Sequence, residues 1–189
     1  MKNPQPKEWL AEKYSNYKVA DYKPFNFVDG EGVRCSLYLS GCLFACEGCY
    51  NKIAQNFDYG VMYTDELEEQ IMADLRQPYV QGLTLLGGEP FLNTQVALRL
   101  AGRIRAEFGD TKDIWSWTGY YWDELAEESE DKLALLSLMD VLVDGRFDLS
   151  KRDLTLKFRG SSNQNIIDVK KSLAANEMVL WTNGYDERA

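Results

Sequence analysis

Histidine is absent from this chain of 189 residues. Its absence excludes zinc sites with mixed cysteine and histidine ligands, and it excludes acid–base catalysis by imidazole. No run approaches the ~20 apolar residues of a membrane span. The first residues, Met-Lys-Asn-Pro-Gln-Pro, contain no apolar core of a signal peptide. We therefore expect a cytoplasmic protein with no membrane partner.

Basic residues are also scarce, since 21 Lys and Arg face 30 Asp and Glu and leave a net charge of -9. Nucleic-acid-binding proteins usually carry a basic footprint, so we expect no nucleic acid partner. With 45% hydrophobic residues, a chain of this length suits one globular domain with a sizeable core. We expect a single domain over residues 1–189, with 1–20 as a helical extension packed on the outside and 166–189 without an assigned role.

Cysteine is limited to four residues, all between positions 35 and 49. In a reducing compartment such clustered thiols are metal ligands rather than disulfides. Cys42, Cys46 and Cys49 have the spacing C-x3-C-x2-C. Iron-sulfur clusters normally take four cysteines, so three thiolates would leave one iron open for a substrate. Cys35 lies roughly 17 Å away along an extended strand, and we expect it to be buried rather than a ligand.

Apolar segments with strand and helix patterns alternate along the chain, which is typical of a parallel sheet covered by helices. Thr64 and Asn93 are expected helix N-caps, and Gly109 is an expected helix stop. Six strands are too few for a closed eight-stranded barrel, so we predict an α/β fold, an open partial (β/α)6 barrel with mostly parallel strands. The expected strands are 34–40, 82–86, 113–118, 139–144, 154–158 and 178–182, and the expected helices are 64–77, 93–109, a helical pair at 122–138, and 164–175.

Four motifs directly follow expected strands, and the carboxyl ends of parallel strands are where α/β sheets bind ligands. They are the cysteine loop, Gly87-Gly88-Glu89-Pro90, Thr118-Gly119-Tyr120 and Asp144-Gly145. We expect them to converge on one rim. Alternatives stay open for single residues, because glycine-rich strand exits are also ordinary turns and Asp144 suits either a helix cap or a ribose contact.

Two further segments allow weaker expectations. Trp115 and Trp117 favour the core or an interface over a cofactor contact, with Ser116 and Thr118 on the opposite face toward the cavity. The polar turn 159–164 suits a substrate loop or a helix N-cap equally well. The turn Asp29–Gly32 is expected to shape the rim near the cysteine loop.

The cysteine triplet resembles the signature of the radical S-adenosylmethionine (SAM) superfamily. With Asn26–Gly32, Gly48–Asn51, Gly87–Phe91, Trp115–Tyr120, Val143–Phe147 and Arg159–Gln164, the series resembles the activating proteins of anaerobic ribonucleoside-triphosphate reductase. The resemblance spans roughly residues 25–165. It implies the same partial barrel, a 4Fe-4S cluster held by Cys42, Cys46 and Cys49, and SAM contacted by Gly48, Cys49, Tyr50, Gly87, Gly88 and Glu89. We expect a Cβ at Gly88 to intrude on the bound methionine.

The resemblance also implies a reaction and its partners. The reduced cluster would cleave SAM to methionine and a 5′-deoxyadenosyl radical, which would remove hydrogen from a glycine of the large reductase subunit. A low-potential donor such as flavodoxin would supply the electron. Hydrogen abstraction needs no acid or base, which agrees with a chain without histidine and with no catalytic side chain beyond cluster and SAM. The alternatives are an activase of the pyruvate formate-lyase type, a short radical SAM enzyme of 7-deazapurine synthesis, and a non-enzymatic iron-sulfur electron-transfer or zinc-binding module.

Overall fold

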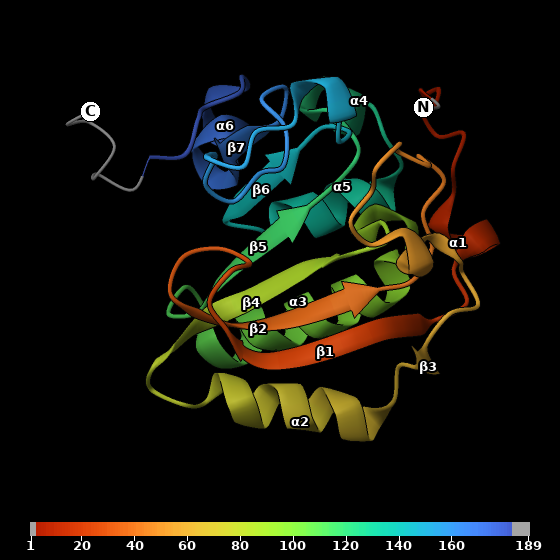
Figure 1. Ribbon diagram of the computed structural model, residues 1–189. Helices are drawn as coiled ribbons and strands as arrows, with labels where there is room; N and C mark the ends of the chain where they lie inside the picture. The colour runs from red at the N-terminus through yellow and green to blue at the C-terminus, as the bar shows by residue number, and fades with distance from the viewer. Residues whose placement is uncertain (1–2, 183–189) are drawn as a thin grey trace.

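The computed structural model describes residues 3–182, in which strands and helices alternate over most of the length (Figure 1). The strands are β1 Lys18–Asn26, β2 Val33–Leu39, β3 Val61–Met62, β4 Val80–Gly87, β5 Asp113–Trp117, β6 Val141–Asp144 and β7 Asn165–Asp168. The α-helices are α1 Ala11–Tyr14, α2 Asp65–Leu75, α3 Thr94–Phe108, α4 Trp122–Leu125, α5 Glu130–Ser137 and α6 Val169–Ala175. Short 3₁₀ helices are η1 Lys52–Gln55, η2 Pro90–Leu92 and η3 Leu149–Lys151.

The strands form one 7-stranded sheet in the order β3-β1-β2-β4-β5-β6-β7. Neighbouring strands from β2 through β4 and β5 to β6 are parallel, and their carboxyl ends point to the same side of the molecule (Figure 1). β1 pairs antiparallel with β2 and β3, and β7 pairs antiparallel with β6. The predicted α/β class with a parallel centre is confirmed. The sheet is not closed, and its antiparallel edges do not follow the predicted repeat of six β/α units.

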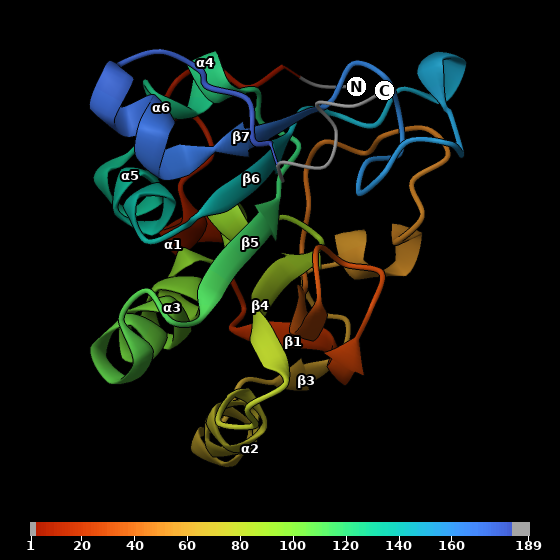
Figure 2. The same ribbon diagram turned by 90° about the vertical axis from the view of Figure 1, so that its left-hand side faces the viewer.

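Helices α2, α3 and α5 cover one face of the sheet, and the long loops gather on the other face (Figure 2). Cys35, Leu37 and Leu39 of β2 are completely buried in the core, as predicted for Cys35. The apolar stripe of α3, expected from its four-residue spacing, is buried in the same core. Among the described residues, no helix has both the length and the apolar character needed to cross a membrane.

The loop-bearing face of the sheet holds a buried polar cluster centred on Arg34. The Arg34 guanidinium is fully buried, pairs with Asp113 at 2.5 Å and donates to Thr84 Oγ1 at 2.7 Å. Thr84 in turn donates to the backbone oxygen of Asp29, and the hydroxyl of Tyr38 donates to the Asp29 carboxylate. These bonds hold the Asp29–Gly32 turn over the sheet. Its expected place at the rim near the cysteine loop is wrong, because no residue of this turn lines the cavity described below.

Several expectations near the chain ends are also wrong. Only four of the described residues of the N-terminal segment are helical, and Trp9 is buried in the core with 3% exposure instead of lying on an external helix. β1 is a nine-residue strand that the sequence pattern did not indicate, since only Val19 within it is fully buried. Residues 1–2 of the expected extension lie outside the described range.

The segment after β6 departs from the predicted order of elements. Residues 154–158 form turns rather than a strand, and Phe158 has a positive φ of 57°. The segment 164–175, expected to be helical throughout, begins as β7, and α6 starts only after Asp168, whose side chain accepts from the Lys171 N–H. The expected strand 178–182 contributes an isolated bridge between Leu180 and Ile167.

Candidate active site

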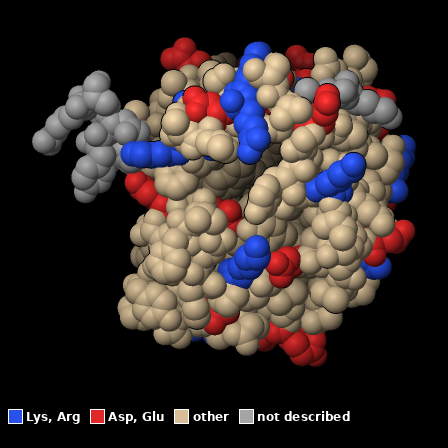
Figure 3. Space-filling view, in the orientation of Figure 1, with Lys and Arg blue, Asp and Glu red and all other residues tan. Residues whose placement is uncertain are grey.

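A cavity of about 620 Å³ opens at the carboxyl ends of the parallel strands, on the loop-bearing face of the sheet. Figure 3 shows a hollow in this face, bordered mostly by surface that is neither acidic nor basic. Every residue that the sequence assigned to the cluster and to SAM lines this one cavity: Cys42, Cys46, Gly48, Cys49, Tyr50, Gly87, Gly88 and Glu89. The predicted convergence of the strand-exit motifs is therefore observed for the cysteine loop, for the Gly-Gly-Glu motif, for Thr118 and Gly119, and for Gly145.

Backbone hydrogen bonds fix both ends of the cysteine loop. Gly41 N–H donates to the Ala54 oxygen at 2.7 Å, and Cys42 N–H donates to the Gln55 oxygen at 3.0 Å. Gly41 has a φ of +96°, which an L side chain rarely adopts, so glycine suits the sharp exit from β2. A further bond, from Glu89 N–H to the Gly41 oxygen, ties the loop to the exit of β4. The thiols are thus carried by a loop that is anchored to two neighbouring elements.

The three thiols line the cavity wall without meeting at one point. In the described part of the chain, no group of three or more cysteine and carboxylate side chains is placed to hold a single metal ion. A tetrahedral zinc needs every sulfur at about 2.3 Å from one centre. A cubane instead gives each thiolate its own iron, and the cavity that the three thiols line has a volume of about 620 Å³.

Two of the thiols, Cys42 and Cys46, are electrostatically costly to ionise in the absence of a metal. Burial raises the pKa of Cys42, and the nearby Glu89 charge adds to this effect, while the Phe44 N–H acts in the opposite direction. Burial likewise raises the pKa of Cys46, against the lowering effect of the Phe147 N–H. Because iron binds the thiolate, the positive charge of bound iron would offset this cost.

Glu89 connects the ends of two strands inside the cavity wall. Its side chain is almost fully buried and accepts from Thr118 Oγ1 at 2.8 Å, from Gly119 N–H at 2.8 Å and from Phe91 N–H at 3.1 Å. Burial raises the pKa of Glu89 to about 7, although these donors act to lower it. Both carboxylate oxygens already have partners in the protein, so Glu89 first of all fixes the shape of the wall.

The two glycines of the Gly-Gly-Glu motif are required by close backbone packing. Gly87 has a φ of +109°, and a Cβ there would lie 2.6 Å from the Leu39 oxygen. A Cβ at Gly88 would lie 2.4 Å from the Gly41 oxygen and 2.7 Å from the Ala54 oxygen. The expectation that a Gly88 Cβ would enter the methionine site is therefore wrong. It would instead push against the backbone that carries the cysteines.

Of the other candidate residues, some line the cavity and others hold neighbouring backbone segments in place. Thr118 lines the cavity as expected, but Ser116 does not, and Trp117, expected in the core, does. Asp144 is buried, accepts from the N–H groups of Trp122 and Asn165, and does not line the cavity, which favours the helix-cap interpretation. In the turn 159–164, Gln164 lines the cavity and donates to the Gly145 oxygen at 2.9 Å.

Sequence reasoning missed the segment that follows β6. Phe147, Leu149, Arg152 and Leu154 line the cavity, and the Phe147 N–H bonds to the Cys46 thiol. The only signal for them was the Gly145-Arg146-Phe147 motif. Their place depends on a loop that folds back across the sheet, which local patterns do not encode.

Comparison with known proteins agrees with this geometry. The profile of the family described as "4Fe-4S single cluster domain" matches residues 28–167. A protein of Haemophilus influenzae named anaerobic ribonucleoside-triphosphate reductase-activating protein is 45% identical over 149 residues, which cover 77% of this chain and 94% of that protein. The protein of the same name from Escherichia coli K12 is 44% identical over 147 residues, covering 76% and 93%. The chain belongs to the anaerobic ribonucleoside-triphosphate reductase-activating proteins.

A relative with lower sequence identity carries the same name. The protein of that name from enterobacteria phage T4 is 37% identical over 145 residues, covering 76% of this chain and 88% of the phage protein. The region matched by the 4Fe-4S profile includes the cysteine loop, the strand-exit motifs and the loop after β6. The region that the 4Fe-4S profile matches therefore contains the residues that line the cavity.

Proposed function

We propose that this chain is an enzyme that activates anaerobic ribonucleoside-triphosphate reductase by generating a glycyl radical on its large subunit. The observation that carries the proposal is the single cavity shared by the three cysteines and the Gly-Gly-Glu motif. Bound and reduced, a 4Fe-4S cluster would supply the electron that splits the C–S bond of SAM, and the resulting radical chemistry would remove a hydrogen from the partner's glycine.

The residues present fit these groups. Cys42, Cys46 and Cys49 are proposed to hold three irons of the cluster, which leaves the fourth for SAM. A cavity of about 620 Å³ lies within the usual range for a cofactor-sized ligand. Gly48, Tyr50, Gly87, Gly88 and Glu89 are proposed to contact SAM, the glycines through their backbone. Positioning and water exclusion are then the contributions of the protein.

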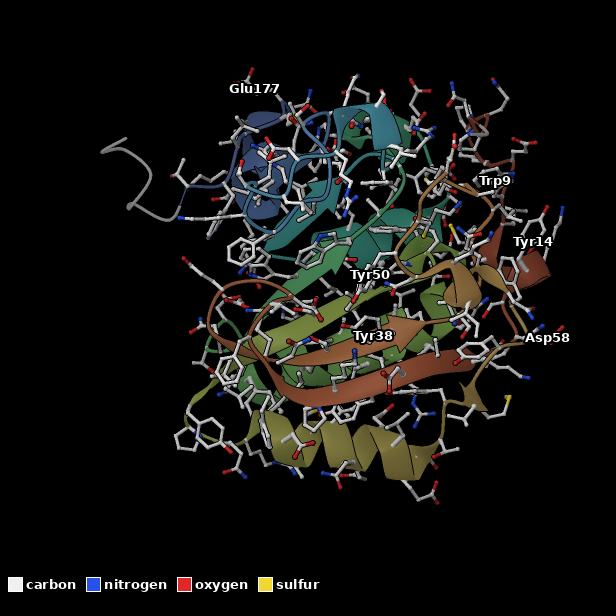
Figure 4. All side chains as sticks on the ribbon, viewed as in Figure 1. Trp9, Tyr14, Tyr38, Tyr50, Asp58 and Glu177 are labelled. Atoms are coloured by element: carbon white, nitrogen blue, oxygen red, sulfur yellow. The ribbon has the colours of Figure 1, made fainter. Side chains whose placement is uncertain are left out.

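The mouth of the cavity is suited to a protein substrate. Tyr50 is 99% exposed and lies in front of the sheet, on the open side (Figure 4). Leu154, Ile53 and Leu149 are 83%, 62% and 45% exposed. Tyr50, Leu149 and Leu154 line the cavity, and Ile53 lies in η1, next to the lining residues Asn51 and Gln55. A loop of the large reductase subunit would cover these four side chains, named here the apolar rim, and exclude solvent from the reacting atoms.

The remaining parts of the proposal concern the setting of the reaction. Residues 1–189 would act as one domain, with the open sheet serving as a partial barrel around the cofactors. A low-potential donor of the flavodoxin type would reduce the cluster in the cytoplasm. Among the described residues beyond 164, Asn165–Asp168 form β7, the last strand in the sheet, and we propose a structural role for this strand.

The partner is tested by anaerobic incubation of the reconstituted, reduced protein and SAM with three candidate substrates in separate arms. These are the reductase large subunit, pyruvate formate-lyase and a 7-deazaguanine precursor. We expect a glycyl radical signal by electron paramagnetic resonance (EPR) only in the reductase arm. A signal on the formate-lyase, or turnover of the precursor, with nothing on the reductase would contradict the proposal. A cluster-bearing protein that never cleaves SAM would instead support the electron-transfer alternative.

A further inference from the structure

One buried cation, Arg146, packs on the aromatic residue in the middle of the cysteine loop, and a second, Lys132, packs on the neighbouring Tyr120 ring. Phe44 stands between Cys42 and Cys46 and is 1% exposed. The Arg146 guanidinium carbon lies 5.0 Å from the centroid of the Phe44 ring. The Tyr120 ring packs edge to face against the Phe44 ring, and the two ring centroids are 5.0 Å apart. The Lys132 ammonium lies 5.2 Å from the centroid of the Tyr120 ring. The four side chains, named here the cation stack, run in the order Arg146, Phe44, Tyr120, Lys132.

The two cations of the stack differ in the exposure of the acidic side chains that pair with them. Lys132 is fully buried and pairs with Glu128 at 2.8 Å, and the Glu128 side chain is itself 1% exposed. Arg146 is equally inaccessible at 2%, but its partner Glu124, at 2.6 Å, is 27% exposed. Solvent screens the charge of Glu124 more strongly than that of the buried Arg146.

Arg146 lies in the backbone segment that forms the cavity wall beside Cys46. Its sequence neighbours Gly145 and Phe147 both line the cavity that contains the three thiols. The Phe147 N–H bonds to the Cys46 thiol. The guanidinium is held in place by the Phe44 ring on one side and by the Tyr121 ring, at 4.8 Å, on another. A rotation of the Arg146 side chain away from the cysteine loop is thus opposed by packing as well as by the ion pair.

We infer that Arg146 raises the reduction potential of the cluster held by Cys42, Cys46 and Cys49, an inference that rests on the proposed function. Reduction adds one negative charge at the cluster, and a fixed cation in a low-dielectric wall stabilises that charge. Net charge and hydrogen bonds to the sulfurs are the means by which a protein sets cluster potentials. The same segment supplies both here, a charge from Arg146 and an N–H donor from Phe147. Glu124 opposes Arg146 and would lower the potential.

The experiment measures the midpoint potential of the reconstituted cluster without SAM, by redox titration followed by EPR. Three variants are compared with the unmodified chain: Arg146→Gln, Arg146→Lys and Glu124→Gln. We expect a lower potential for Arg146→Gln, a nearly unchanged one for Arg146→Lys and a higher one for Glu124→Gln. The Glu124→Gln shift should be the smaller, because the carboxylate is screened. Arg76→Gln is the control, since Arg76 is half exposed and pairs with Glu107 on the helical side.

Opposite shifts separate an electrostatic role from a structural one. Damage to the fold would move both glutamine variants in the same direction or reduce their iron content together. Unchanged potential in Arg146→Gln at full iron content, or shifts of the same sign in Arg146→Gln and Glu124→Gln, would overturn the inference. If the Arg146→Gln variant does not hold a cluster, the midpoint potential of the Glu124→Gln variant is the deciding measurement. An unchanged potential in Glu124→Gln would then overturn the inference. Failure of the proposed function looks different, because the unmodified cluster would then not cleave SAM whatever its potential.

Discussion

The backbones of Gly41 and Gly88 touch, so that a Cβ added at Gly88 would stand only 2.4 Å from the Gly41 oxygen. Gly88 N–H donates to the Leu39 oxygen, and Glu89 N–H donates to the Gly41 oxygen, each at 2.7 Å. The exit of β4 and the start of the cysteine loop are therefore one packed unit. Changes in the Gly-Gly-Glu motif should reach the thiols even when they touch no ligand.

The first prediction follows from this contact. Gly88→Ala should destabilise the metal-free protein by about 1–3 kcal/mol, the usual range for overpacking, and should lower the iron bound on reconstitution. Gly102→Ala is the matched control, because a Cβ at that helical position meets nothing within 4 Å. It should stabilise the protein by roughly 0.5–1 kcal/mol. Thermal unfolding and iron analysis check both variants. Normal iron and stability in Gly88→Ala would show that the loop yields more easily than the contact suggests.

The second prediction assigns the four cysteines. Cys42→Ala, Cys46→Ala and Cys49→Ala should each fail to reconstitute a normal 4Fe-4S cluster and should not cleave SAM. Cys35→Ala should keep both properties, because Cys35 is completely buried in the core on the helical side. Its loss should cost on the order of 1 kcal/mol of stability from lost packing. Iron and sulfide analysis, with methionine release from SAM, measures the result. A Cys35→Ala chain without a cluster beside a Cys42→Ala chain with one would reverse the assignment.

A third prediction uses the buried carboxyl of Glu89. Its pKa is raised from 4.5 to about 7, so the folded chain holds this proton more tightly than the unfolded chain does. The stabilisation is fully present below pH ~4.5 and is lost as pH rises through about 7. In the metal-free protein, the unmodified chain should lose on the order of 2–3 kcal/mol across this window relative to Glu89→Gln. Denaturant unfolding at several pH values measures the difference. Parallel pH curves would mean that Glu89 ionises normally.

A fourth prediction concerns the apolar rim. Ile53 is 62% exposed and does not line the cavity, so Ile53→Asp should leave the cluster and SAM cleavage intact. It should reduce the glycyl radical yield on the reductase several-fold, because a charge would be desolvated on docking. Leu173→Asp on α6, where Leu173 is 47% exposed, is the control and should keep the full yield. Equal yields from the two variants would place the docking surface elsewhere.

The sequence predicted most reliably those features whose causes are local. Thr64 accepts from Leu67 N–H as an N-cap, and Gly109 ends α3 with a φ of 56°. The buried stripe of α3 follows from its spacing. The cysteine triplet and the strand-exit motifs were found because each is contiguous, and their convergence follows from the polarity of parallel strands.

Features that depend on tertiary pairing were missed. β1 contains Pro24 and two exposed charged residues, Asp21 and Lys23, so its pattern lacks clean alternation, and it is defined by antiparallel pairing with β2. The β7 segment was expected to be part of a helix because α6, capped by Asp168, follows it directly. The position of Arg146 was not predicted for the same reason, since its contacts with Phe44 and Tyr121 join residues far apart in the chain.

The most direct test of the proposed reaction follows the hydrogen atom itself. The reductase large subunit is labelled with α-deuterated glycine and incubated anaerobically with the reduced protein and SAM. We predict an EPR signal of a glycyl radical on the reductase and one deuterium in the 5′-deoxyadenosine released. Unlabelled 5′-deoxyadenosine with no radical on the reductase would contradict the central claim.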